Sequence, residues 1–219
     1  MSTSLPISRD SEAKLEHILR HAAQIFAERG FEGASIRDIS RASGVSLAGL
    51  YYYFDSKQEL LYLIQNATFS RVLESVRLRL NSVHEPVARL RVLVQNHVEY
   101  FLSHPHEMKV LSHEDEALEE PYYEKVAAIK RRYYALAREI FDALAADGLA
   151  PGVNPRLAVL SLFGMMNWVY KWHNAKVDPD PTELTEAIVG LFLYGVLSRP
   201  SEGKEALDLT ATPVISAET

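Results

Sequence analysis

The segment at residues 35–54 constrains the fold most, because it contains two short helix-forming stretches separated by a tight turn. Ile36 and Ile39 give the first stretch an apolar side, and Gly44 can adopt the left-handed conformation that ends a helix. Ser46 can begin the second stretch by accepting a hydrogen bond from a free backbone N–H. This arrangement is typical of a helix-turn-helix, which places its second helix in the major groove of DNA.

The side chains of the second stretch that we expect to face outward are small at its start and carry aromatic hydroxyls further along. They are Leu47, Ala48, Gly49, Tyr51, Tyr52 and Tyr53. Small residues let the backbone approach DNA closely, and none of the six carries a negative charge that would repel phosphate. We interpret this side of the helix as the part that reads DNA, with Val45 and Leu50 holding the two helices together.

Three sequence segments extend the motif in both directions. They read ILRHAAQIFAERGF at residues 18–31, SIRDISRASGV at residues 35–45 and LYYYFDSKQEL at residues 50–60. In this order and spacing they resemble the TetR family of transcriptional regulators, over about residues 12–60. The resemblance implies a repressor that binds double-stranded operator DNA as a homodimer and is released by a small-molecule effector.

The resemblance also implies roles for individual residues. It implies that Arg37 contacts phosphate or a base and that Lys57 contacts phosphate. Lys57 stands at the start of a predicted helix, where the backbone amides also favour phosphate. The other DNA-binding residues that it implies are Ser35, Ser46, Leu47, Ala48, Gly49, Tyr51, Tyr52 and Tyr53.

Composition excludes several other classes of protein. The 219 residues include no cysteine, which rules out disulfides, thiolate metal ligands and a thiol nucleophile. The lack of cysteine agrees with a reducing cytoplasm, and we find neither a signal peptide nor an apolar run long enough to span a membrane. Glycine-rich phosphate loops and GxSxG motifs are also missing. We therefore expect a cytoplasmic protein without membrane contact, catalytic activity or cofactor.

The net charge of −6 is unevenly distributed along the chain. Residues 1–80 contain 10 Lys or Arg against 9 Asp or Glu, whereas the remaining residues contain 13 against 20. Binding to phosphates needs local cations, so the distribution matters more than the total. The acidic excess lies in the part that, by the resemblance, points away from DNA.

The periodicity of apolar residues, with capping residues and prolines at helix starts, predicts about nine helices and no strand. Beside the two short helices of the motif, these cover about residues 10–28, 56–80, 86–102, 105–115, 121–146, 154–175 and 181–197. The predicted fold is all-α, with an N-terminal three-helix head and a C-terminal helical domain for ligand binding and dimerisation. We place the head at residues 1–56, the C-terminal domain at 57–199 and a mobile tail at 200–219.

Apolar residues on the last two predicted helices mark the predicted dimer interface. They are Leu157, Leu160, Gly164, Leu184, Ile188, Leu191, Phe192 and Gly195. The resemblance implies that these two helices and their mates from a second copy form a four-helix bundle. A dimer also suits the motif, because two heads must reach successive major grooves about 34–36 Å apart.

Basic and aromatic residues on two of the C-terminal helices predict a binding site for an effector. They are Lys130, Arg131, Arg132, Tyr133, Met165, Trp168, Lys171 and Trp172. An apolar slot beside a cationic mouth suits an acyl chain attached to coenzyme A, whose phosphates favour Arg and Lys. Residues 163–174 also resemble the Trp-rich helix of TetR-like regulators of fatty-acid and steroid catabolism, which implies an acyl-CoA effector.

Three alternatives to this effector site stay open. Trp168 and Trp172 can instead pack in the dimer interface, with the basic run at residues 130–132 exposed to solvent. The effector can be a drug-like apolar cation. The protein can also be an architectural DNA-binding dimer that has no ligand.

A histidine-rich segment raises the question of a metal site. His104 and His106 are separated by a proline, and His113 has Ala117 where a helical metal pair would need a second histidine. We therefore expect no metal site there.

Overall fold

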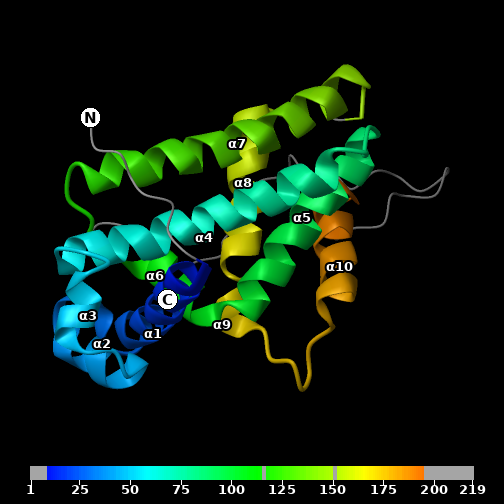
Figure 1. The fold of residues 1–219 in the computed structure, drawn as a ribbon. Helices are drawn as coiled ribbons and strands as arrows, with labels where there is room; N and C mark the ends of the chain where they lie inside the picture. The colour runs from blue at the N-terminus through cyan, green and yellow to red at the C-terminus, as the bar shows by residue number, and fades with distance from the viewer. Residues whose placement is uncertain (1–8, 115–116, 150–151, 195–219) are drawn as a thin grey trace, which may run out of the picture.

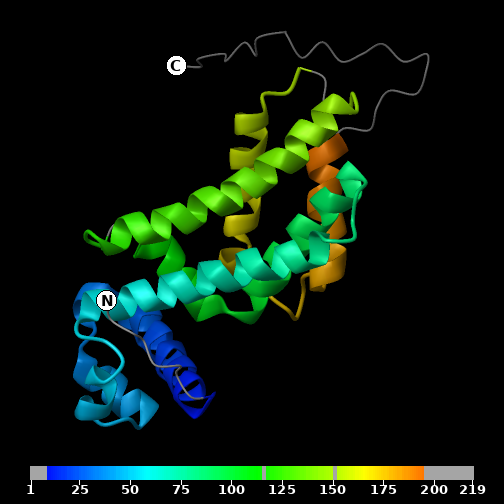
Figure 2. The same ribbon diagram turned by 45° about the horizontal axis from the view of Figure 1, so that its top comes forward.

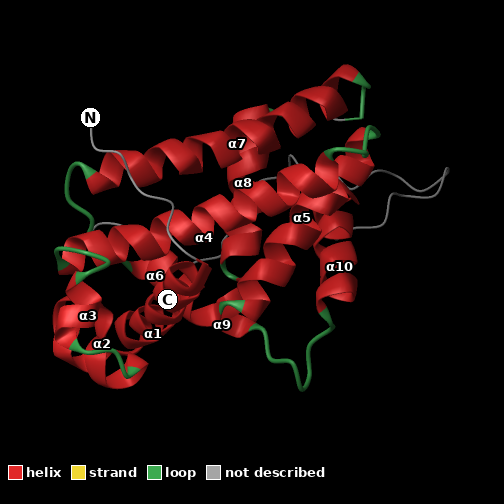
Figure 3. Cartoon of the chain, in the orientation of Figure 1, coloured by secondary structure: helices red, strands yellow, loops and turns green. Residues whose placement is uncertain are grey.

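The computed structural model describes residues 9–114, 117–149 and 152–194, and every regular element in these ranges is a helix (Figure 3). The helices are α1 (Arg9–Gly33), α2 (Ile36–Ser43), α3 (Leu47–Tyr51), α4 (Lys57–Leu80), α5 (Pro86–Ser103), α6 (Pro105–His113), α7 (Tyr122–Ala146), α8 (Pro155–Asn167), α9 (Val169–Trp172) and α10 (Pro181–Tyr194). The all-α prediction is confirmed. The predicted helix at 154–175 divides at Trp168 into α8 and α9. The predicted tail at 200–219 lies outside the described residues, as does Gly195.

Local capping sets the ends of the N-terminal helices. Gly30 interrupts α1 with a φ of +73°, a conformation that glycine adopts without strain. Ser35 caps α2 through reciprocal hydrogen bonds with Asp38. Gly44 ends α2 with a φ of +68°, and the side chain of Ser46 caps α3. These ends agree with the turn and caps predicted from the sequence.

The long helix α4 joins two hydrophobic cores (Figures 1 and 2). Its first half packs on the head formed by α1, α2 and α3, where the buried side chains include Ile18, Phe26, Ile39, Leu50, Phe54, Leu60 and Leu61. Val110 from α6 and Val126 from α7 belong to the same cluster. The head therefore shares its core with helices from the rest of the chain.

The second core lies between α4, α5, α7, α8 and α10. Its fully buried side chains include Val76, Leu90, Val94, Ile140, Leu144, Val159 and Leu162. Burying one such side chain stabilises the fold by about 1.5–3 kcal/mol. Helix α5 packs against α4, α7 and α10, so its inward residues lie at the centre of this part.

Candidate DNA-reading surface and ligand cavity

The first helix of the motif is held by charged side chains around Asp38. Its carboxylate accepts a hydrogen bond from Ser35 and pairs with Arg29 at 3.0 Å and Arg41 at 2.6 Å. The hydrogen bonds from Ser35, followed by the two guanidinium groups, hold the pKa of Asp38 below its usual value. Arg37 is exposed and makes no ion pair within the described ranges. Both arginines of α2 are exposed, but Arg41 is engaged with Asp38 whereas Arg37 is not.

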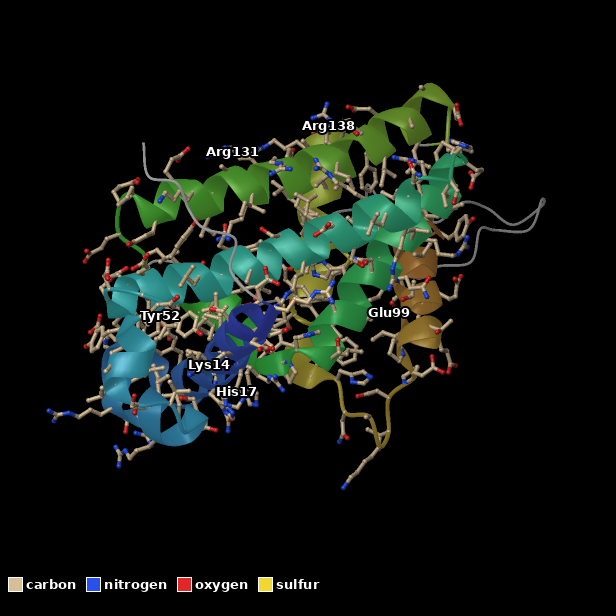
Figure 4. All side chains as sticks on the ribbon, in the orientation of Figure 1. Lys14, His17, Tyr52, Glu99, Arg131 and Arg138 are labelled. Atoms are coloured by element: carbon tan, nitrogen blue, oxygen red, sulfur yellow. The ribbon has the colours of Figure 1, made fainter. Side chains whose placement is uncertain are left out.

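The exposed side of α3 carries most of the predicted recognition residues. Tyr52 is the most exposed of them, at 77%, and lies just after α3 (Figure 4). The hydroxyl of Ser46 lies 3.1 Å from the backbone N of Gly49, and a Cβ on Gly49 would come within 3.0 Å of Val45. Packing inside the motif therefore explains why residue 49 is a glycine, since a larger side chain would crowd Val45. The other exposed recognition residues are Leu47, Ala48 and Tyr51.

Tyr53 does not face outward as predicted. Its half-buried ring packs with the head core, and its hydroxyl accepts a hydrogen bond from Ser11 of α1 at 3.3 Å. Both residues lie in the turn after α3, where the N–H of Tyr53 donates to the carbonyl of Leu50, and this turn directs Tyr53 toward α1 while Tyr52 faces solvent. Tyr53 positions α1 against the motif.

Lys57 is also placed differently from the prediction. Its Nζ donates a hydrogen bond to the carbonyl oxygen of Phe31 at 2.8 Å and lies 4.3 Å from the centre of the Phe31 ring. The same amine lies 3.4 Å from the carbonyl oxygen of Ala34. Phe31 lies in the last turn of α1, after the break at Gly30, and Ala34 follows the helix, so their carbonyls need partners outside it. The amine therefore connects α4 to the end of α1, and its contact with phosphate stays a prediction.

A cavity of about 470 Å³ lies between α4, α5, α6, α7 and α8. Its size is in the usual range for small-molecule sites, about 300–1,000 Å³. Among the described residues its polar lining consists of His97, Ser112, Lys130 and Asn167 with the hydroxyls of two tyrosines, and includes no Asp or Glu. The apolar and aromatic lining residues are Phe69, Val72, Phe101, Met108, Leu111, Tyr133, Tyr134, Phe163 and Trp168.

The basic run of α7 does not form one cationic mouth as predicted. Only Lys130 lines the cavity, whereas Arg131 pairs with Glu124 on the side of α7 that faces away from α4 (Figure 4). Arg132 lines a separate groove together with Arg77 of α4. The reason is helical geometry, because three consecutive residues point in three directions.

The remaining predicted effector residues divide in the same way. Tyr133 and Trp168 line the cavity. Met165 and Trp172 instead line an apolar depression between α8, α9 and α10, which Trp168 also borders. Lys171 lies beside the cavity residue Trp168, with its Nζ 6.0 Å from the ring centre.

The predicted dimer residues fall into two groups. Leu184 and Ile188 are buried, and Phe192 packs on Phe141 of α7 with ring centres 5.5 Å apart, so these three belong to the core of one chain. The apolar side chains of α8, α9 and α10 that stay exposed form a surface that we call the α8–α10 face. It consists of Leu157, Leu160, Met165, Trp168, Trp172 and Leu191, with Gly164 between them.

His97 lies in the cavity wall among aromatic rings. It stacks on Phe101 with ring centres 3.7 Å apart, and its Nδ1 lies 3.1 Å from the hydroxyl of Tyr133. Its Nε2 has no hydrogen-bond partner within the described ranges. Burial lowers the pKa of His97 to about 3, a shift that the Asn167 side chain only partly opposes, so the ring is neutral near pH 7.

Helix α6 connects the cavity to the head. Its Met108 and Leu111 line the cavity, and the carboxylate of Glu114, at its C-terminal end, accepts a hydrogen bond from the backbone N of Phe31 at 3.1 Å. The carbonyl oxygen of Glu114 accepts another from Gln65 of α4 at 3.1 Å. A displacement of α6 by a ligand therefore reaches both α1 and α4.

The residues of α5 and α6 are absent from the predicted effector set, although they form much of the cavity. His97 gave one signal, since it stands among Val94, Val98 and Phe101 on an otherwise apolar stripe. A titratable residue on such a stripe is either buried with a partner or part of a site. Periodicity alone does not tell these two cases apart.

Metal binding finds no support in the histidine-rich segment. His113 lies 3.0 Å from the hydroxyl of Tyr170, and within the described ranges no three His, Cys, Asp or Glu residues gather as metal ligands would. None of the described helices combines the length and the apolar character needed to cross a membrane.

Two family models match the chain in order. The model described as bacterial regulatory proteins, tetR family, matches residues 18–62. The model described as tetracyclin repressor-like, C-terminal domain, matches residues 83–196, which is more than half of the chain. The chain belongs to the TetR family of transcriptional regulators. It is therefore a DNA-binding regulator, as the helix-turn-helix predicts.

Three similar proteins represent this family. The repressor NicS of Pseudomonas putida is 27% identical over 65% of this chain and 68% of its own length. The activator FasR of Mycolicibacterium smegmatis is 26% identical over 83% of this chain and 81% of its own. The structure of AibR in complex with isovaleryl coenzyme A and operator DNA superposes with a TM-score of 0.75 and 28% identity, covering 81% of this chain and 97% of AibR.

The different settings of Arg37 and Lys57 lead to a prediction about the TetR head. Arg37→Ala should weaken operator binding and reduce the salt dependence by about one phosphate, without changing the melting temperature. Lys57→Ala should lower the melting temperature as well, because the carbonyls of Phe31 and Ala34 lose their donor. Operator titrations across salt and thermal melting measure the two effects.

The contrary result is equally specific. Lys57→Ala could instead reduce the salt dependence of operator binding by one phosphate and leave the melting temperature unchanged. The amine would then release the carbonyl of Phe31 and contact DNA. The structural role given to Lys57 would then be wrong.

Proposed function

We propose that the protein is a homodimeric TetR-family repressor that releases its operator when an acyl-CoA ester places its acyl group in the cavity. In this proposal residues 1–56 form the DNA-binding head, and residues 57–199 form the part that binds the ligand and dimerises. The observation that carries the proposal is the lining that the described residues give the cavity, which is apolar and aromatic and includes Lys130 but no carboxylate. AibR, which is similar in sequence and fold, was crystallised with isovaleryl coenzyme A and operator DNA.

The same lining disfavours a drug-like cation as the effector. Lys130 in the lining repels a cationic ligand, and among the described lining residues no carboxylate offsets this repulsion, so only the aromatic rings would attract a cation. A ligand-free architectural dimer gives no reason for a cavity of about 470 Å³ beside α6. An acyl group fits this volume, while the nucleotide part of coenzyme A would remain outside it, near Lys130 and Lys171.

The contrast between Lys130 and Arg132 provides a test of the effector. Lys130→Met should weaken the binding of isovaleryl-CoA and octanoyl-CoA about tenfold, since a charge-assisted hydrogen bond is lost. Arg132→Met is the matched control and should leave binding unchanged, because Arg132 lies in another groove. Calorimetric titration measures both, and absence of binding by every acyl-CoA ester would reject this class of effector.

The link through Glu114 predicts how binding reaches DNA. Glu114→Ala removes the carboxylate that holds Phe31, so it should shrink the difference between operator affinities with and without effector. Such coupling is typically about 1–3 kcal/mol, or roughly 5- to 150-fold in affinity. Effector affinity itself should stay within about twofold, since Glu114 does not line the cavity. The exposed Glu119, on the same connection between α6 and α7, gives the control Glu119→Ala.

The α8–α10 face predicts the dimer. Leu157 and Leu191 are 61% and 47% exposed, so replacing both by Asp should not unfold one chain but should prevent two copies from packing. The variant should sediment as a monomer and lose most of its operator affinity. Val177→Asp changes an equally apolar residue that is 78% exposed but outside this face, and it should remain a dimer. A double variant that still dimerises would place the interface elsewhere.

A further inference from the structure

We propose that His97 recognises a carbonyl oxygen within the apolar part of the effector, through a hydrogen bond donated by its Nε2–H. The proposal rests on the cavity being the effector site, as proposed above. It adds the chemistry that the occupant must carry. A hydrocarbon without oxygen would fill the cavity but leave the Nε2–H of His97 without an acceptor. An acyl group with a keto or thioester carbonyl would fill the cavity and also accept this hydrogen bond.

The hydrogen bond to Tyr133 decides which ring nitrogen carries the proton. Burial raises the pKa of Tyr133, so its phenol is neutral and has one proton to donate. If Tyr133 donates to Nδ1 of His97, the Nε2–H is the only group of the pair left without a partner. If His97 donates instead, both the phenol proton and Nε2 lack partners within the described ranges. The first arrangement leaves fewer buried groups unsatisfied, so Nε2 is the donor.

The surroundings of His97 leave this donor to a ligand. Phe101 and Phe163 lie against the imidazole, with ring centres 3.7 Å and 6.1 Å from it, and neither offers an acceptor. Asn167, in the last turn of α8, interacts with His97 through a side-chain hydrogen bond that partly opposes the fall of its pKa, although no described atom meets full hydrogen-bond geometry at Nε2. The Asn167 side chain is exposed, so it can rotate and a ligand carbonyl can take its place. Buried donors without partners are rare in native proteins, and a bound acceptor accounts for this one.

The charge of the site selects an uncharged oxygen. His97 is neutral, so it offers a donor without a positive charge. Lys130 is the cation of the lining, and its Nζ lies over the ring of Phe69, 5.3 Å from the centre. A carboxylate placed at His97 would exchange its hydration for a single neutral donor among aromatic rings, whereas a carbonyl loses less hydration and needs only that donor.

Two small probes of nearly the same shape test the proposal. Acetophenone and ethylbenzene differ by one carbonyl oxygen, and both are smaller than the cavity. Acetophenone should bind the full-length protein at least about tenfold more tightly, because it pairs the buried donor. In protein with nitrogen-labelled histidine, only acetophenone should shift the NMR signal of the His97 Nε2–H.

Two variants separate recognition from folding. The double variant His97→Phe/Tyr133→Phe removes both partners of the buried hydrogen bond and keeps two rings, so it should fold and bind the two probes equally. His97→Gln keeps a donor and should retain part of the preference for acetophenone. Thermal melting confirms that each variant is folded.

Several outcomes would overturn the proposal. They are equal affinities of the two probes for the wild-type protein, a preference for acetophenone that persists in the double variant, and no binding of either probe. The probes contain no coenzyme A, so a failure of the acyl-CoA proposal is read separately, from titrations with the CoA esters.

Discussion

The structure depends on how the chain is held at Phe31, directly after the break in α1. Gly30 breaks α1 with a positive φ, and directly after this break the backbone groups of Phe31 bond to neighbouring helices. The N–H of Phe31 donates to Glu114 of α6, and its carbonyl accepts from Lys57 of α4. Three helices far apart in sequence therefore meet at one residue, and none of them can move without changing a hydrogen bond there.

The hydrogen bonds of Phe31 to Glu114 and Lys57, which we call the Phe31 joint, explain why the head is not an independent unit. A backbone group that loses its partner inside a protein costs about 1–3 kcal/mol, so the joint resists separate motion of α1, α4 and α6. The apolar core reinforces it, because Val110 of α6 packs with Ile18 and Phe26 of the head. A ligand that displaces Met108 or Leu111 in the cavity wall thus acts on the orientation of the head rather than on its internal fold.

The sequence predicts the head well, because its signals are local. The cap at Ser46 and the glycine at Gly44 each act within a few residues, and each lies where expected. Tyr53 and Lys57 show the limit, since their partners on α1 are 42 and 26 residues away. The cavity is harder to predict because five helices contribute to it. A run of adjacent cations on one helix then gives a misleading picture, since helical geometry sends its members to different surfaces.

Trp168 links the two proposed activities of the C-terminal part. It lines the cavity and also borders the apolar depression of the α8–α10 face, and it is 57% exposed in one chain. Residue 168 is also where the predicted single helix divides into α8 and α9, so the backbone there is free of regular α-helical constraint. If a second copy covers this face, the outer wall of the cavity becomes part of the interface. Ligand binding and the relative position of the two heads are then coupled through one side chain, in addition to the route through α6.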